Sequence, residues 1–128
     1  MIVVDTHAWL WWISDPGRLT APARGAIERA DRIGVCTISC WEVATLVRRG
    51  RIELDREVGL WVRQALIADR IEPLALTPEV AVRAGSLGDG FHGDSADRIV
   101  YATALSSESS VVTRDAQMRA FDRQRTIW

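Results

Sequence analysis

The sequence contains no lysine: all 16 of its basic residues are arginine. Chemistry that depends on a side-chain amine is therefore excluded. Because 17 acidic residues balance the arginines, the net charge is −1, and composition gives no sign of the strongly basic surface typical of nucleic-acid binding. Biased codon usage explains the missing lysine more simply than selection for contacts with phosphate.

Cysteine is also scarce, since Cys36 and Cys40 are the only two. Two thiols make no disulfide framework, and with two histidines they offer too few soft ligands for a zinc site. Cys36 lies in an apolar run and Cys40 precedes a tryptophan, so we expect both to be buried free thiols. This cysteine usage predicts a cytoplasmic protein.

Long apolar runs are missing as well. The first apolar run, residues 1–4, is interrupted by Asp5, and no run approaches the roughly 20 residues that a membrane span needs. We therefore expect neither a secretory signal nor a membrane partner. The composition, 48% hydrophobic and 26% charged, is typical of a globular protein, and residues 1–128 are expected to form one domain.

Short apolar segments alternate with amphipathic ones along the chain. Consecutive β-branched residues, as in the first segment, are typical of strands that are buried on both faces. Pro73 cannot donate to a strand ladder, so its segment is expected at a sheet edge. Strands are expected at residues 2–4, 34–38, 71–76, 110–113 and 126–128. Their alternation with helices predicts an α/β fold with a parallel sheet covered on both faces.

The most informative stretch is residues 91–105, where a polar loop runs into an apolar helix. Asp94 and Asp97 lie three residues apart at this junction. A helix start has unpaired N–H groups and a positive dipole end, so the two acids suit a capping pair, with Asp94 as the N-cap. Capping alone would explain them.

Three further acids lie at comparable junctions: Asp5 ends the first strand, Glu42 opens the helix after the second, and Asp115 follows the strand at 110–113. Each has a local role available to it. Asp5 can form a turn, Glu42 can pair with Ser39 in a capping box, and Asp115 can cap the last helix. Local roles for all of them together, always at strand ends, are a weaker explanation than one shared site.

Parallel strands present their carboxyl ends at one edge of the sheet, where ligands bind in open α/β folds. The acids are therefore expected to converge there. Gathered carboxylates repel one another unless they share protons or bind a cation, and oxygen ligands suit Mg²⁺ or Mn²⁺. Metals held in this way serve the hydrolysis of phosphodiester bonds.

Four short motifs, each carrying an acid, follow one another in the order seen in PIN-domain proteins. They are IVVDTH at residues 2–7, ISCWEV at 38–43, HGDSADRI at 92–99 and VTRD at 112–115. The chain resembles the PIN-domain family, and within it the VapC-type toxin ribonucleases, over nearly its whole length. One departure is Ser95, where many relatives carry proline at the helix start; it removes no ligand.

The resemblance implies a three-layer α/β/α PIN-like domain with a central, mostly parallel sheet of four to five strands. It implies a metal-dependent endoribonuclease in which Asp5, Glu42, Asp97 and Asp115 hold Mg²⁺ or Mn²⁺. Asp5 and Asp97 would bind the metal directly, and Asp94 would lie beside them as a helper acid. RNA is the implied substrate, and a VapB-like antitoxin and a second copy of the chain are the implied partners.

Several polar residues flank the acids. The hydroxyls of Thr6, Ser39 and Thr113 can orient a carboxylate or a water, although local capping suits them better. Arg98 and Arg114 can neutralise an acid, contact a phosphate or form a structural ion pair. His7 and His92 are expected to be structural or solvent-facing.

Three of the six tryptophans, Trp9, Trp11 and Trp12, fall in one short segment that is apolar nearly all round. Core packing is expected for Trp9 and Trp12, but an exposed ring among the three would anchor an interface, so all three are candidates for contact with the antitoxin. A basic cluster at Arg48, Arg49 and Arg51 suits a solvated helix end, an RNA or an acidic segment of the antitoxin.

Two other functions compete with a nuclease. A phosphoaspartate protein, such as a receiver domain, also places an acid after its first strand, but it needs the lysine that this chain lacks. A catalytically inert PIN-like module would bind RNA or a partner without cleavage; the complete set of acids argues against it.

Overall fold

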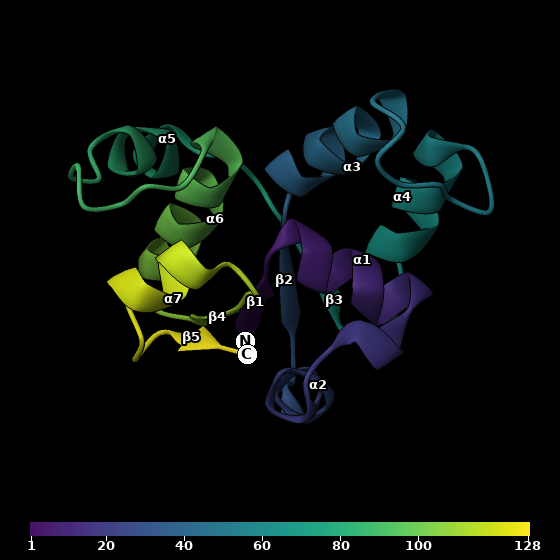
Figure 1. The fold of residues 1–128 in the computed structure, drawn as a ribbon, viewed down its shortest axis with the longest axis horizontal. Coiled ribbons are helices and arrows are strands. Elements are labelled where there is room, and N and C mark those ends of the chain that lie inside the picture. Colours follow the sequence, from purple (N-terminus) through teal and green to yellow (C-terminus); the bar gives the residue numbers. More distant parts are fainter.

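The computed structural model describes residues 1–128, and a five-stranded sheet lies at its centre (Figure 1). The strand order is β3-β2-β1-β4-β5, and every neighbouring pair is parallel. The strands are β1 (Ile2–Val4), β2 (Ile33–Cys36), β3 (Ile71–Leu74), β4 (Ser110–Val112) and β5 (Thr126–Ile127). The predicted α/β class is confirmed, and the Pro73 strand lies at an edge.

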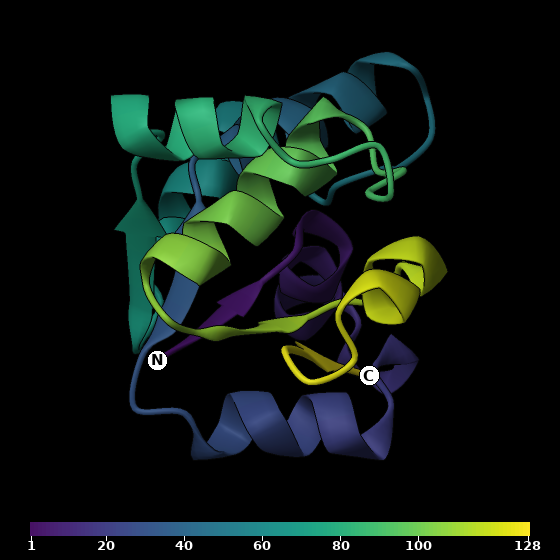
Figure 2. The ribbon, with the colours of Figure 1, turned by 90° about the vertical axis from the view of Figure 1, so that its left-hand side faces the viewer.

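Seven α-helices and one 3₁₀ turn connect the strands (Figures 1 and 2). They are α1 (Thr6–Ser14), η1 (Pro16–Arg18), α2 (Ala21–Arg29), α3 (Ile38–Arg48), α4 (Val58–Leu66), α5 (Pro78–Gly85), α6 (Ser95–Ser106) and α7 (Ala116–Phe121). None of these helices combines the length and the apolar sequence needed to cross a bilayer.

The alternation of side chains along β1 divides the core between the two faces of the sheet. Val4 belongs to a cluster with Trp9 of α1 and Ile27 of α2, whereas Val3 packs with Val100 of α6 and Met118 of α7. Because successive side chains of a strand point to opposite faces, helices cover both sides. The result is the expected three-layer α/β/α arrangement. Helix α5 lies against α6 (Figure 2).

Two predicted strands end two residues earlier than expected: the one at residues 71–76 ends at Leu74, and the other difference affects a helix start. The strand expected to run to residue 38 ends at Cys36, and α3 begins at Ile38, so Ser39 lies inside the helix instead of capping it. Thr37, at the N-cap position, makes no side-chain capping bond. Ile38 packs against the α6 side of the core from the first turn of the helix. An apolar run alone does not show where a strand gives way to a helix.

Candidate functional site

The five acids selected from the sequence line a single cleft of about 1140 Å³. Asp5 follows β1, Asp115 lies three residues after the end of β4, and Glu42 is the fifth residue of α3. Asp94 and Asp97 lie at the start of α6. Chain segments that are far apart in the sequence therefore bring their carboxylates to the carboxyl edge of the parallel sheet, as predicted.

Three of these acids also cap helices. One carboxylate oxygen of Asp5 accepts a hydrogen bond from the Ala8 amide at 2.8 Å, and one of Asp115 accepts from the Met118 amide at 2.7 Å. Asp94 accepts from the amide of Asp97 at 2.9 Å. Capping and a shared site are thus not alternatives here. Each cap holds its carboxylate at a helix start that faces the cleft.

Asp5 is the most deeply buried of the five, at 7% exposure. Burial raises the pKa of its carboxyl, and the charge of Glu42 adds to the rise. The Thr113 hydroxyl, the Ala8 amide and the neighbouring His7 act in the opposite direction.

The pKa of Asp97 depends on its burial and on the charges of the other four acids. Burial raises its pKa to about 7, and the negative charges of Asp94, Asp115, Glu42 and Asp5 contribute in that order. An acid with this pKa is about half protonated at neutral pH. A cation in the cleft would reverse the effect by favouring the ionised form.

The loop before α6 has no room for a larger residue next to Asp97. A Cβ atom on Gly93 would lie 2.8 Å from the Cβ of Asp97 and 2.5 Å from Cε1 of Phe91. Phe91 is 2% exposed and packs on Tyr101, so its ring has little freedom to move away. Glycine in this motif therefore allows the loop to approach the acid closely.

The donor chemistry of the cleft fits a hard divalent cation. Its lining offers carboxylate and hydroxyl oxygens and no thiolate. No three His, Cys, Asp or Glu side chains, however, are arranged as a ready metal-binding group. The acids that could hold a cation remain Asp5, Glu42, Asp97 and Asp115, and they would have to move closer together to do so.

The flanking hydroxyls form contacts between elements. Thr6 donates to the Ser39 hydroxyl at 2.8 Å, which joins α1 to α3 beside the cleft; both residues are buried. Thr113, also buried, accepts from the Asp115 amide at 3.0 Å. The capping box expected between Ser39 and Glu42 is therefore wrong, and Glu42 is left to face the cleft.

Arg98 does not pair with an acid, contrary to one of the roles expected for it. Its guanidinium donates to the backbone carbonyls of Ala84, Leu87 and Phe91, at 3.0 to 3.2 Å. It thereby ties the connection between α5 and α6 to the helix that carries Asp97. The side chain acts on the site through this loop.

The tryptophans of α1 are not exposed anchors. Trp9 is fully buried, Trp11 is 7% exposed and Trp12 is half-buried against the core. The core packing expected for Trp9 and Trp12 is confirmed, and Trp11 does not supply an exposed ring either. The exposed tryptophan is Trp41 on α3, with 59% of its surface accessible.

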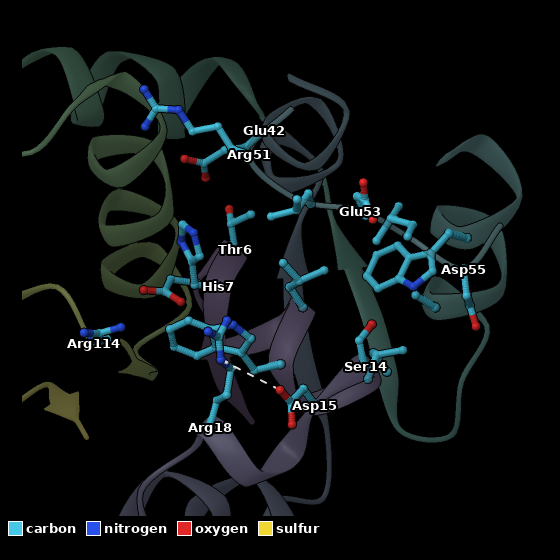
Figure 3. Close-up of a pocket in the computed structure, with 18 of the residues that line it drawn as sticks. Thr6, His7, Ser14, Asp15, Arg18, Glu42, Arg51, Glu53, Asp55 and Arg114 are labelled. Atoms are coloured by element: carbon cyan, nitrogen blue, oxygen red, sulfur yellow. Dashed lines mark ion pairs between the residues drawn. The ribbon is translucent and has the colours of Figure 1, made fainter. Parts of the chain in front are cut away.

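Sequence reasoning missed the far part of the cleft. The cleft continues past the acids along α1 and the connection at residues 51–56, where Figure 3 labels Arg51, Glu53 and Asp55. It also reaches one face of α4, where Trp61 and Gln64 line it. Arg18 of the 3₁₀ turn lies there too. No motif marks these residues, because the packing of α4 against α1 and α3 brings them to the site.

Comparison with known proteins decides the family. A model of the PIN domain family matches residues 2–124. The chain belongs to the PIN-domain family. Ribonuclease VapC22 of Mycobacterium tuberculosis is 38% identical to it over 129 residues, which cover 99% of this chain and 98% of that protein. The family membership expected from the four motifs is confirmed.

Solved structures share the fold of this PIN domain. A toxin–antitoxin complex from Klebsiella pneumoniae superposes with a TM-score of 0.70 at 18% identity, and covers 100% of this chain and 97% of that one. VapBC2 from Rickettsia felis, bound to a DNA fragment from its promoter, gives 0.69 at 13% identity, with 98% and 97% covered.

Proposed function

We propose that this PIN-domain protein is a VapC-type endoribonuclease that hydrolyses RNA phosphodiester bonds with Mg²⁺ or Mn²⁺, as the toxin of a VapBC-type toxin–antitoxin system. The convergence of five carboxylates in one cleft, where burial and the neighbouring negative charges together raise the pKa of Asp97 to about 7, carries this proposal. The 38% identity to a protein named ribonuclease VapC22 supports the reaction class.

The metal would be held by Asp5 and Asp97, with Glu42 and Asp115 bound to it directly or through water. A divalent cation supplies activation of water for attack on the phosphodiester and stabilises the negative charge that develops there. The cation would also offset the repulsion among the carboxylates and draw them together from the arrangement seen here.

The remaining residues of the cleft hold these acids in place. Asp94 caps α6 through the amide of Asp97 and so fixes the backbone of that acid. The buried Thr113 hydroxyl binds the amide of Asp115, and the Thr6–Ser39 bond ties Asp5 and Glu42 through their own helices. Outer hydrogen bonds of this kind orient carboxylates that bind metals.

Cleavage of RNA by the purified chain, freed of any antitoxin, tests the proposal. We expect activity with Mg²⁺ or Mn²⁺, none in excess EDTA, and a loss of at least about a hundredfold in Asp97→Asn and Asp5→Asn. Asp69→Asn is the matched control, since the Asp69 side chain is 96% exposed and lies outside the cleft. Equal cleavage in EDTA would contradict the metal mechanism.

A toxin of the VapC type would act together with an antitoxin and with a second copy of itself. We propose a VapB-like antitoxin that inhibits the protein, a homodimer as its assembly and the cytoplasm, where RNA is available, as its place of action. The shared fold with a toxin–antitoxin complex and with VapBC2 supports an antitoxin partner.

The competing function is an inert PIN-like module that binds RNA or a partner without cutting. A ligand that binds only the folded state raises its melting temperature. A shift with Mn²⁺ that disappears in Asp97→Asn favours the nuclease, whereas no shift in the wild type favours the inert module.

A further inference from the structure

Two arginines rest against one tryptophan ring in the wall of the cleft. The guanidinium carbon of Arg18 lies 5.4 Å from the centroid of the Trp11 ring, and that of Arg114 lies 5.7 Å from it. Arg18 belongs to the 3₁₀ turn and Arg114 to the connection between β4 and α7. All three side chains line the cleft that holds the acids. Figure 3 labels the two arginines.

The Trp11 ring serves as a support and not as an open stacking surface. Only 7% of the residue is exposed, and besides the arginines its ring contacts His7 at 5.5 Å and Trp128 at 5.9 Å between centroids. A nucleotide base has no free face of this ring to stack on. The ring instead attracts the two guanidinium groups through its negative face, which limits how far these exposed side chains move.

Neither guanidinium is neutralised by a close acid. Arg114 has no carboxylate within 4 Å, and the only one near Arg18 is Asp15 at 3.8 Å, where both side chains are 63% exposed. A pair this long and this exposed is weak. Both cations are therefore free to bind an anion.

Two other arginines near the cleft are already engaged, whereas Arg51 also lines the cleft without an ion pair but has no aromatic ring to hold it. Arg56 binds Asp55 with two nitrogens and also contacts Gln64. Arg98 donates hydrogen bonds from Nη1 and Nη2 to three backbone carbonyls. Arg18 and Arg114 differ from these two because their guanidinium groups, although held over a ring, make no hydrogen bond within the protein.

We propose that Arg18 and Arg114, supported by Trp11, bind phosphate groups of the RNA strand beside the carboxylates and so position the strand for cleavage. The inference rests on the proposed function and adds the anchor for its substrate. Arg114 directly precedes Asp115, so a phosphate that it binds would lie next to the acidic cluster. Planar guanidinium groups match the two oxygens of a phosphate, and their charge offsets the repulsion between RNA and the acids.

Steady-state cleavage of a fluorescently labelled single-stranded oligoribonucleotide in Mn²⁺ tests the anchor. Arg18→Gln and Arg114→Gln are each expected to raise KM roughly three- to tenfold and to leave kcat within about twofold. The slope of log KM against log salt concentration should fall by about 0.7 for each phosphate that the variant no longer binds. Arg119→Gln, an exposed arginine of α7 outside the cleft, removes the same charge and should change none of these values.

The proposed phosphate contacts of Arg18 and Arg114 would be contradicted by either of two results for the double variant. One is a wild-type KM with a wild-type salt slope, and the other is a lower kcat with an unchanged KM. Urea denaturation should give equal midpoints for all these surface variants. If the wild type does not cleave RNA at all, the proposed function fails separately. Fluorescence anisotropy of the same oligoribonucleotide then decides the anchor, which stands only if the cleft variants bind more weakly than Arg119→Gln.

Discussion

Asp97 is partly buried where the charges of four other carboxylates converge, and burial, followed by these charges, raises its pKa to about 7. The unfolded chain would titrate this group near 3.8. Because the folded pKa is the higher one, the folded protein loses stability as the pH rises from about 4 to about 7 and the group ionises. The loss is complete above pH 7, unless a cation occupies the cleft.

Asp97→Asn should therefore stabilise the metal-free protein at alkaline pH, because it removes a charge that burial disfavours and that repels its neighbours. Urea denaturation in EDTA should show a gain of about 1–2 kcal/mol in the free energy of unfolding at pH 8, a value reduced for the partial exposure of the group, and almost none at pH 4. Asp69→Asn should show no such difference. A gain of the same size at both pH values would mean that the ionised carboxylate is not its source.

At the scale of single residues, the sequence predicts the positions of the acids better than it predicts the hydrogen-bond partners of the residues around them. The spacing of Asp94 and Asp97 predicts their places at the start of α6, because capping depends only on local backbone geometry. The partners of Ser39 and Arg98 cannot be predicted in this way. Ser39 meets Thr6 across 33 positions of sequence, and Arg98 meets carbonyls that only the packing of α5 on α6 brings near.

The connection between α5 and α6 is the element on which the position of Asp94 depends. Arg98 binds two carbonyls of this connection and one at the end of α5. Gly93 lets the connection lie close against Asp97. The backbone hydrogen bond from Phe91 to Gly88, at 3.0 Å, is among the few that fix residues 87–93.

Arg98→Gln should loosen this connection, because a shorter amide cannot reach three carbonyls at once. We expect the free energy of unfolding to fall by about 1–3 kcal/mol, faster amide hydrogen exchange at residues 86–94 and slower RNA cleavage. Arg83→Gln, an exposed change on α5, is the control. Exchange that is faster everywhere to the same degree would argue against a local role for Arg98.

The elements themselves follow from periodicity and turn residues, except at the start of α3. Thr77 before Pro78 marks the start of α5, and the Thr77 hydroxyl accepts from the Val80 amide at 3.2 Å. The run from Val35 to Ile38 carries no such signal, because its residues suit a strand and a helix equally. Packing of Ile38 against the far face of the sheet selects the helix.

For the whole molecule, the parallel sheet accounts for the convergence of the acids, since every strand pair places its carboxyl ends at one edge. That convergence was predictable from strand order in the sequence and from the position of each acid after a strand. Two other features could not be predicted: the part of the cleft along α4, and the contact of two arginines with Trp11. Both depend on how the helices pack against one another.

The central claim is that carboxylates from separate segments jointly bind one divalent cation, and calorimetric titration with Mn²⁺ tests it most directly. We expect binding in the wild type and in Asp69→Asn, loss of it in Asp5→Asn and Asp97→Asn, and an affinity that falls about tenfold for each pH unit below about 7, as protons compete for Asp97. Mn²⁺ bound equally well by Asp97→Asn, or with no dependence on pH, would contradict the account.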